Sequence, residues 1–451
     1  MSLPPVAMLG KLAALRRMTN VVGFFNELHG TYGDIVRFDV PGRTHIAVFE
    51  ADLVRQVLEA QADALPPLNP VSSFEVVQAE VLARKPPGED HARLQELVAS
   101  AYTPERIAFQ DQVAAEEGER LADSLNPGAV DLRASAEEFA YRTLARIVIG
   151  GGEELGREVV SPSLLAIKFN FILFAMPGYR FVKRLPLPHD LKARKAIRPL
   201  DEVTYREIDR ARRSDAVPVS MVGHLVRAAS RFDWRFDDDR HIRDEAYAIL
   251  LGAVDGIVHT LSLAPYYLGR HPEVQALLEE EVDRTTDLSR LRNTRAVVME
   301  LLRVQPPATI LVPRVAVRDC TIGGYLIPKG AFVDVGIHTI HRRPDYWQEP
   351  DSFRPERWLD GTRPGCHFMP FSLPPKQCQG ADLAPKLMTA ALAAVARRWR
   401  LEYGGAEFPP PVGLRPGSFS GGVTASVTAR PANGRATPPE PHFGQPEDQP
   451  E

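Results

Sequence analysis

Apolar residues recur at helical spacing through most of the chain. From Asp90 to about Arg303 they return every three or four positions, the spacing of one helix face, and Pro- and Gly-containing breaks divide the region into separate helices. The most apolar stretch, Tyr247–Arg270, predicts a long helix with one acid, Asp255, near its middle. Because an unpaired carboxylate is costly inside such a helix, the pattern predicts that Asp255 is hydrated, paired or functional.

Alternating apolar and polar residues, which are typical of half-buried β-strands, occupy only short stretches. Asp34–Phe38 and His45–Phe49 alternate in this way and predict a hairpin. Short strands are also predicted within Val315–Pro328, around a turn at Gly323–Gly324, and at Ala331–Val335. This balance predicts a mainly α-helical fold with small β-sheets, of the α+β class.

The chain has 451 residues, and it contains no internal repeat and no Gly/Ser linker before its C-terminus, so we expect one large domain over residues 1–430. Residues 431–451 are Pro-rich and polar, which predicts disorder. Hydrophobic residues at 44% and charged residues at 25% are ordinary globular values. The net charge of −4 gives no reason to expect nucleic acid or an anionic membrane as a partner.

Three cysteines, Cys320, Cys366 and Cys378, are too few for a disulfide scaffold and indicate a reducing, cytoplasmic compartment. Met1–Arg17 has no apolar run long enough for a signal or transmembrane segment, so no membrane anchor is expected. Cys320 falls in a predicted strand and Cys366 in an irregular Pro/Gly stretch, and both are expected to be inert.

Cys378 has the most distinctive surroundings of the three cysteines. The segment Phe371–Gly380 contains a bulky aromatic residue, a short loop, the cation Lys376 and then the cysteine, and a helical pattern follows it. Backbone N–H groups at a helix N-terminus favour a thiolate over a thiol, as does a nearby cation. A thiolate held in this way suits an axial bond to haem iron. A buried, inert cysteine is the alternative, and it would be favoured for a cysteine without such neighbours.

Two charged clusters accompany this cysteine. Glu300 and Arg303, at i and i+3, share a helix face just before Pro306–Pro307. Arg357 lies in a second cluster, Phe353–Trp358, which is flanked by aromatic residues. We expect the glutamate and the two arginines to form one semi-buried ion cluster with a structural role, in which bidentate geometry holds the core near the cysteine loop.

The cysteine segment, the Glu300–Arg303 pair and the Phe353–Trp358 cluster, in this order and spacing, resemble those of the cytochrome P450 superfamily of haem-thiolate oxygenases. The resemblance covers approximately residues 15–430. It implies a P450 fold in one large domain, and haem b with Cys378 as the axial ligand of its iron. It further implies oxidation of a hydrophobic, secondary-metabolite-like molecule, with an external ferredoxin and its reductase, or a flavodoxin, as electron donor.

The resemblance also implies which residues contact the haem. His91 and Arg314 match propionate contacts of the family, and Phe371 is the aromatic residue that opens the cysteine segment. Lys376 stands where the family has an arginine, and Gln95 where it has a basic residue four positions after the histidine. His91, Arg314 and Lys376 are therefore expected to anchor the haem with one charge fewer than usual.

The helix that carries Asp255 departs from the family next to this acid. The family's pattern of small residue, Gly, any residue, acid and Thr falls on Gly252–Gly256, so Gly256 replaces the threonine that helps deliver protons to dioxygen. Asp255 and Gly256 are the candidate catalytic positions, with a water or a substrate hydroxyl in place of the missing side chain. Thr260, one turn on, is a less suitable substitute, and His259 is expected to be a packed histidine.

Three regions are expected to form the substrate site. The irregular stretch Pro66–Pro87 falls where the family has a substrate-contacting loop. The apolar cluster Phe169–Met176 falls where the family has an access lid, although ordinary helix packing explains it equally well. The cavity itself is expected to be apolar and to suit a hydrophobic substrate, with three lining residues: Ala253, Leu311 and Phe419.

Three functions remain open at this point. The first is a monooxygenase that uses dioxygen and external electrons, and it is the function we expect. The second uses the same fold and haem for peroxide-dependent chemistry, or for oxidative rearrangement, cyclisation or coupling, which the missing threonine favours. The third is a haem-poor relative that assists another enzyme, and the intact Cys378, Glu300, Arg303 and Arg357 argue against it.

Overall fold

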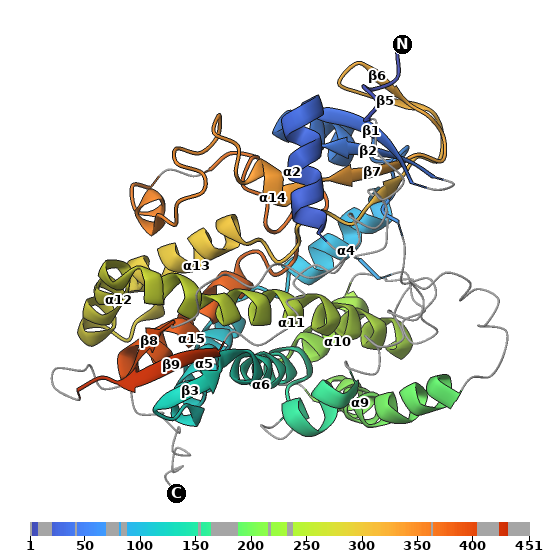
Figure 1. Cartoon of the computed structure of the whole chain (residues 1–451). Coiled ribbons are helices and arrows are strands. Elements are labelled where there is room, and N and C mark those ends of the chain that lie inside the picture. Colours follow the sequence, from blue (N-terminus) through green and yellow to red (C-terminus); the bar gives the residue numbers. More distant parts are fainter. Residues whose placement is uncertain are drawn as a thin grey trace, which may run out of the picture.

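Helices make up most of the molecule (Figure 1). The long helix α11 (Asp239–Arg270) crosses the middle of the helical part (Figure 1). The largest sheet lies above this helix in the view, near the N-terminus (Figure 1). This is the mainly α-helical fold with small sheets that the sequence predicts. The computed structural model describes the following residues, and the account is confined to them: 2–7, 20–40, 43–68, 81–82, 88–151, 155–163, 188–214, 218–231, 238–361, 364–403 and 424–431.

The largest sheet joins distant parts of the chain. β1 and β2 pair antiparallel with Ile35 opposite Val48, which confirms the predicted hairpin. β2 pairs in parallel with β7. Across this pairing His45 Nδ1 lies 2.8 Å from Asp334 Oδ2, although the two residues are 289 positions apart in the sequence. In the order β1-β2-β7-β4, the strands are β1 (Ile35–Val40), β2 (Arg43–Val48), β7 (Phe332–Val335) and β4 (Arg314–Val315).

Two smaller sheets complete the β structure. β5 (Cys320–Ile322) and β6 (Tyr325–Ile327) form a hairpin with its turn at Gly323–Gly324. Both glycines have positive φ, 55° and 79°, which L side chains rarely adopt, so the turn needs glycine there. The third sheet has the order β3-β9-β8, with β3 (Gly128–Asp131), β9 (Thr424–Ala429) and β8 (Trp399–Glu402).

The other helices lie either near the largest sheet or in the helical part of the molecule. Those near the sheet are α2 (Val21–Tyr32), α3 (Ala51–Arg55) with its continuation η1 (Gln56–Ala60), and α14 (Ile337–Ile340). The helical part contains α4 (Glu89–Ala99), α5 (Pro104–Ser124), α6 (Leu132–Leu144), η3 (Ala145–Ile149), η4 (Gly156–Val160), α9 (Pro188–Arg213), α10 (Met221–Arg231), α12 (Pro272–Arg284), η5 (Leu288–Arg290), α13 (Arg292–Val304), η6 (Pro355–Trp358) and α15 (Leu383–Arg398).

Helix α11 is longer than the sequence pattern predicts. It begins at Asp239 and not at Tyr247, because the Asp238 carboxylate accepts a hydrogen bond of 2.6 Å from the N–H of Arg240 and caps the helix. Helices α6, α10, α12, α13 and α15 pack around it. Among the described helices, α11 alone is long and apolar enough to cross a membrane, and 61% of its apolar stretch is buried inside the protein.

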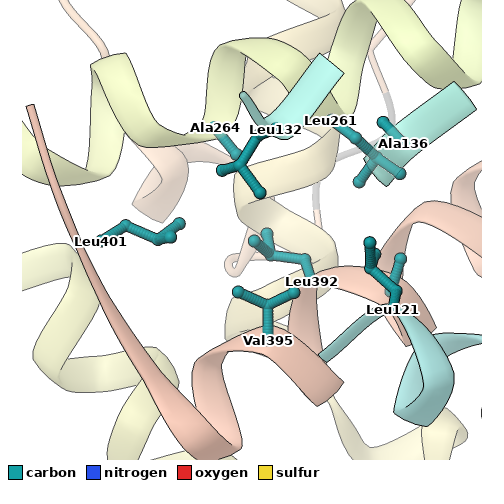
Figure 2. A pocket seen from close by; sticks show the side chains of 9 residues that line it. Leu121, Leu132, Ala136, Leu261, Ala264, Leu392, Val395 and Leu401 are labelled. Atoms are coloured by element: carbon teal, nitrogen blue, oxygen red, sulfur yellow. The ribbon is translucent and has the colours of Figure 1, made fainter. Parts of the chain in front are cut away.

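A small apolar cavity of about 20 Å³ lies where α5, α6, α11 and α15 meet (Figure 2). A cavity of this size holds about one water molecule, but a water needs polar partners, and no polar side chain lines this one, so we expect it to be dry. It is a packing defect in the helical core. Its lining residues, which include no predicted site residue, are Leu121, Leu132, Ala136, Leu261, Ala264, Ala391, Leu392, Val395 and Leu401.

Candidate active site

The loop that carries Cys378 is closed by its own backbone. The N–H of Cys378 donates to the carbonyl of Phe371 at 2.8 Å. Beyond the cysteine, the N–H of Gly380 lies 3.4 Å from Cys378 Sγ, and helix α15 begins at Leu383. These contacts hold the sulfur at a fixed place just before the helix, and they give Phe371 a structural part in the loop through its carbonyl.

The Cys378 thiol does not have the lowered pKa that the sequence predicts. Part of the residue is exposed to solvent, but the surrounding protein removes much of the hydration of the sulfur. This desolvation raises the pKa of the thiol, and the hydrogen bond from the Gly380 N–H acts in the opposite direction. The prediction was wrong because desolvation of the sulfur outweighs the Gly380 N–H, the one backbone group among the described residues that lowers the pKa of this thiol. A metal bound to the sulfur removes this cost, since a coordinating thiol is deprotonated outright.

Three basic side chains lie near this loop. Lys376 is part of it, Arg314 begins β4, and His91 lies in the first turn of α4. Desolvation lowers the pKa of Lys376 to about 8, as does the charge on Arg314, while Glu245 acts in the opposite direction. Desolvation and the charge on Lys376 together lower the pKa of His91 to about 4. At neutral pH His91 is therefore an uncharged hydrogen-bonding group, and Lys376 and Arg314 carry the positive charge.

Arg314 indicates what these residues are suited to bind. Its side chain is 5% exposed, and desolvation lowers its pKa to about 10. Its Nη1 donates to the carbonyl of Leu65 at 3.4 Å, whereas its buried Nε has no hydrogen-bond partner among the described residues. A buried cation in this state is costly, and a neighbouring anion offsets the cost. Haem offers an iron for the thiolate and two propionates for the cations, so the residues fit this group.

A contact that the sequence does not predict connects the cysteine loop to the start of α11. The N–H of Leu82 donates to Glu245 Oε2 at 3.0 Å, and its carbonyl accepts a hydrogen bond of 3.1 Å from Lys376 Nζ. Desolvation raises the pKa of the buried Glu245 to about 7, against the effects of the Leu82 N–H and the Lys376 charge. Residues 81–82, at the end of the expected substrate-contacting stretch, are thus held between loop and helix.

Glu300, Arg303 and Arg357 come together in one buried cluster. Arg303 donates twice to Glu300, from Nε at 3.0 Å and Nη2 at 2.8 Å, and Arg357 Nε donates to it at 3.1 Å. Glu300 also accepts hydrogen bonds of 2.9 Å from Trp358 Nε1 and from the N–H of Arg354, two partners that the sequence does not predict. The cluster fastens α13 to η6 and the chain before it.

Asp255 and Gly256 have different surroundings on α11. Asp255 is exposed, as a hydrated carboxylate is, and its charge acts on Tyr141 of α6. Desolvation raises the pKa of Tyr141 to about 12, and the negative charges on Glu137 and Asp255 add to the rise. Gly256 faces Pro307, and a Cβ built on the glycine would lie 3.9 Å from the proline ring, an ordinary contact distance. The position therefore has room for a Cβ, although the chain has no side chain there.

Thr260 and His259, the polar residues that follow Gly256 on α11, have partners elsewhere. Thr260 is fully buried, and its hydroxyl donates to the carbonyl of Gly256 at 3.0 Å. His259 is also buried, with Nε2 3.0 Å from the carbonyl of Gln305, which is the arrangement of a packed histidine. The threonine hydroxyl is thus committed to the helix backbone.

The predicted substrate-site residues lie in separate parts of the core. Ala253 packs against the main helical core, and Leu311 packs against the core of the largest sheet, where its N–H donates to Val335 at 3.1 Å. Phe419 and the cluster Phe169–Met176 lie outside the described residues. Helix α11 meets the chain before Leu311 at two places, where His259 Nε2 lies 3.0 Å from the carbonyl of Gln305 and where Gly256 faces Pro307.

The cysteine loop, the buried glutamate–arginine cluster and the long central helix define the haem-thiolate class of proteins. The family model for Cytochrome P450 matches residues 1–420, so the chain belongs to the cytochrome P450 family. Two solved structures share its fold. A retinoic acid-bound cyanobacterial CYP120A1 has a TM-score of 0.76 at 17% identity, over 95% of this chain and 100% of that chain. A zebra fish cytochrome P450 with abiraterone has a TM-score of 0.71 at 20% identity, over 90% and 98%.

Curated relatives are similar to this chain over most of its length. Cyclooctat-9-en-7-ol 5-monooxygenase from Streptomyces melanosporofaciens is 26% identical over 82% of this chain and 83% of that protein. Abscisic acid 8'-hydroxylase 1 from Oryza sativa subsp. japonica is 26% identical over 88% and 85%. Pentalenene oxygenase from Streptomyces avermitilis is 26% identical over 70% and 72%. With such relatives, the chain is a P450-type monooxygenase.

Proposed function

We propose that this chain binds haem b and oxidises a hydrophobic, terpenoid-like small molecule with dioxygen, using electrons from a separate ferredoxin or flavodoxin. The observation that carries the proposal is the grouping of Cys378 with two cations, the half-buried Lys376 and the buried Arg314, because it brings an iron ligand and anion contacts together. The terpenoid substrate class is supported by the names of two relatives, cyclooctat-9-en-7-ol 5-monooxygenase and pentalenene oxygenase.

Each residue around the loop has a separate task in this proposal. Cys378 ligates the iron, Lys376 and Arg314 bind the propionates, and His91 adds an uncharged hydrogen bond. Bound haem supplies the redox chemistry that activates dioxygen. Because Lys376 carries three N–H donors, it can hold a propionate while it keeps its hydrogen bond to Leu82. The cofactor and the substrate-contacting stretch are therefore held by the same ammonium group.

Asp255 supplies protons in this proposal. Its exposed carboxylate exchanges protons with water, and Gly256 beside it leaves space for a water or a substrate hydroxyl. The same helix offers room for a bulky substrate at Gly252, where a Cβ would have no atom within 4 Å. Helix α11 thus combines a proton source with an unobstructed surface of small residues.

A reduced, carbon-monoxide-bound absorbance spectrum tests the axial ligand. Wild type, Cys320→Ser and Cys366→Ser are expected to give the thiolate-type Soret band, and Cys378→Ser is expected to lose it. Retention of that band by Cys378→Ser would rule out this assignment. A pyridine haemochrome spectrum then identifies the haem as type b or not.

Turnover with a panel of terpenes and terpene alcohols tests the substrate class. With a surrogate ferredoxin system and ¹⁸O₂, we expect products that carry one labelled oxygen from at least one panel member. Flat aromatic compounds of similar size serve as the comparison. Oxidation of these alone would contradict the terpenoid proposal and leave the monooxygenase assignment intact.

A second function, turnover driven by peroxide, is favoured by the environment of Gly256. No hydroxyl is present at this position, and that of Thr260 is bound to the Gly256 carbonyl. Comparing the product yield with hydrogen peroxide against the yield with dioxygen and ferredoxin separates the two functions. Yields at least as high with peroxide, with the oxygen label derived from it, would favour this second function.

A further inference from the structure

One peptide unit beside Cys378 is hydrogen-bonded at both ends. Its N–H, on Gly380, lies 3.4 Å from Cys378 Sγ. Its carbonyl, on Gln379, accepts a hydrogen bond of 2.6 Å from the Tyr102 hydroxyl. Hydrogen bonds in a chain polarise one another, so a donor at the carbonyl makes the N–H of the same peptide a stronger donor. The Tyr102 hydroxyl therefore acts on the sulfur through this peptide.

Tyr102 is fixed from the side of the protein core. It lies in the turn between α4 and α5, where its N–H donates to the carbonyl of Ala99 at 3.0 Å. Arg106, one turn further along, is 1% exposed and donates to the carbonyls of Ala101 at 2.9 Å and Val219 at 3.1 Å. These contacts hold the turn, and hence the tyrosine, against the cysteine loop.

The Tyr102 hydroxyl keeps its proton and is therefore a permanent donor. Desolvation raises its pKa to about 12, against the charge on Arg106, and the charges on Cys378 and Asp382 add to the rise. The effect of Cys378 also indicates that the sulfur lies within electrostatic range of the hydroxyl. The Gln379 carbonyl is thus hydrogen-bonded by Tyr102 over the whole neutral pH range.

We propose that Tyr102 is a positioning residue that sets the electron density of the Cys378 thiolate through the Gln379–Gly380 peptide. The inference rests on the proposed role of Cys378 as axial ligand. A thiolate that accepts a stronger N–H bond gives less electron density to a metal, and hydrogen bonds around a ligand tune redox potential in this way. Tyr102 thereby raises the reduction potential of the iron and weakens the iron–sulfur bond.

Haem-loaded Tyr102→Phe tests the inference by potentiometry and by the iron–sulfur stretching frequency. At a fixed electrode potential the ratio of iron(III) to iron(II) is expected to rise about two- to threefold, the order of effect of one cooperative hydrogen bond. The stretching frequency is expected to rise as well. Tyr247→Phe is the matched control, because it removes a hydroxyl that donates to Asp201 at 2.8 Å between α11 and α9, and it should leave both readouts unchanged.

The outcomes separate this inference from the proposed function. Tyr102→Phe with wild-type potential and frequency, and only a lower melting temperature, would make Tyr102 a structural brace and overturn the inference. If that variant does not retain haem, 3-fluorotyrosine at position 102 replaces it: the fluorine strengthens the donor, so both readouts should move the opposite way, and no movement overturns the inference. A wild-type protein without the thiolate spectrum would instead remove the proposed function.

Discussion

Two acids of this chain, Glu300 and Asp255, have different surroundings, which suit them to different tasks. Glu300 has no exposed surface and is held by the side chains of Arg303, Arg357 and Trp358. A carboxylate in this state is structural, because all of its charge is compensated inside the protein. Asp255 is exposed on α11, which suits it to the proton delivery that we propose.

Replacing Glu300 by alanine should destabilise the protein strongly. Arg303 and Arg357 would remain buried without their partner, which costs on the order of 3–5 kcal/mol. We expect insoluble or haem-free protein, measured by soluble yield and melting temperature. Glu356→Ala is the control, since it removes an exposed carboxylate that pairs with Arg354 at 2.8 Å, and it should change the free energy of unfolding by about 1 kcal/mol or less. A soluble Glu300→Ala protein with normal haem content and melting temperature would contradict the structural role.

Asp255→Asn should slow turnover with dioxygen and spare turnover with peroxide. General acid assistance is typically worth about 10²–10⁴-fold, and peroxide needs fewer protons delivered by the protein. The measurement is the coupled product rate with each oxidant. Equal dioxygen-driven rate and coupling in Asp255→Asn and wild type would show that Asp255 is only a solvent-facing helix residue.

Gly256→Thr tests the neighbouring position. There is room for a Cβ, 3.9 Å from Pro307, so the variant should fold. The added hydroxyl should raise coupling with dioxygen, or the added bulk should displace the substrate. Spectral titration of substrate binding distinguishes these two outcomes, and a variant with unchanged coupling and affinity would mean that Gly256 does not face the reaction.

The contact between α11 and the cysteine loop places a buried acid in the middle of the fold. Glu245 accepts the Leu82 N–H, and its carboxyl has a pKa of about 7 against an ordinary value of 4.5. The folded protein therefore binds this proton more tightly than the unfolded chain does. The resulting stabilisation is complete below about pH 4.5 and is lost as the pH rises through 7.

Glu245→Gln isolates this effect, because the amide keeps an acceptor for Leu82 but does not titrate. Between pH 5 and 8 the free energy of unfolding of wild type should fall relative to that of Glu245→Gln by about 2–3 kcal/mol. Urea unfolding of both proteins across this range measures the difference. Parallel pH profiles for the two proteins would mean that Glu245 is already ionised in the folded state at pH 5.

The sequence predicts the local elements well and the contacts between distant ones poorly. The hairpin of β1 and β2, the Gly323–Gly324 turn and the neighbouring Glu300 and Arg303 are all encoded in a few adjacent residues. By contrast, Tyr102 and Gln379 are 277 residues apart, and no spacing rule connects them. The prediction for the pKa of Cys378 fails for a related reason. Desolvation of the sulfur depends on all the residues around it, including those distant in the sequence.

The molecule as a whole is held by apolar clusters of unequal size. The largest is built from the helices around α11 and extends from α4 to β9, and smaller ones lie under the sheet and beside α2. The cavity in Figure 2 lies within the largest cluster. Loss of packing around this cavity should therefore lower the free energy of unfolding of the helical part.

Leu392→Ala should enlarge this cavity and destabilise the protein. Leu392 is 3% exposed on α15, and a leucine-to-alanine change at such a site costs about 2–5 kcal/mol. Leu277→Ala, at a leucine that is 49% exposed on α12, is the control and should stay within about 0.5 kcal/mol of wild type. Urea unfolding measures both, and equal effects would mean that the helical core collapses around the cavity without cost.

The parallel pairing of β2 with β7 constrains how the chain folds during synthesis. His45 and Asp334 are in contact within it, although they are 289 positions apart in the sequence. At about 5–20 residues per second, the ribosome needs roughly 15–60 s to proceed from β2 to β7. During that interval the β1–β2 hairpin exposes an unpaired strand edge, which is a template for aggregation. The newly made chain is therefore open to aggregation at this edge until β7 has been synthesised.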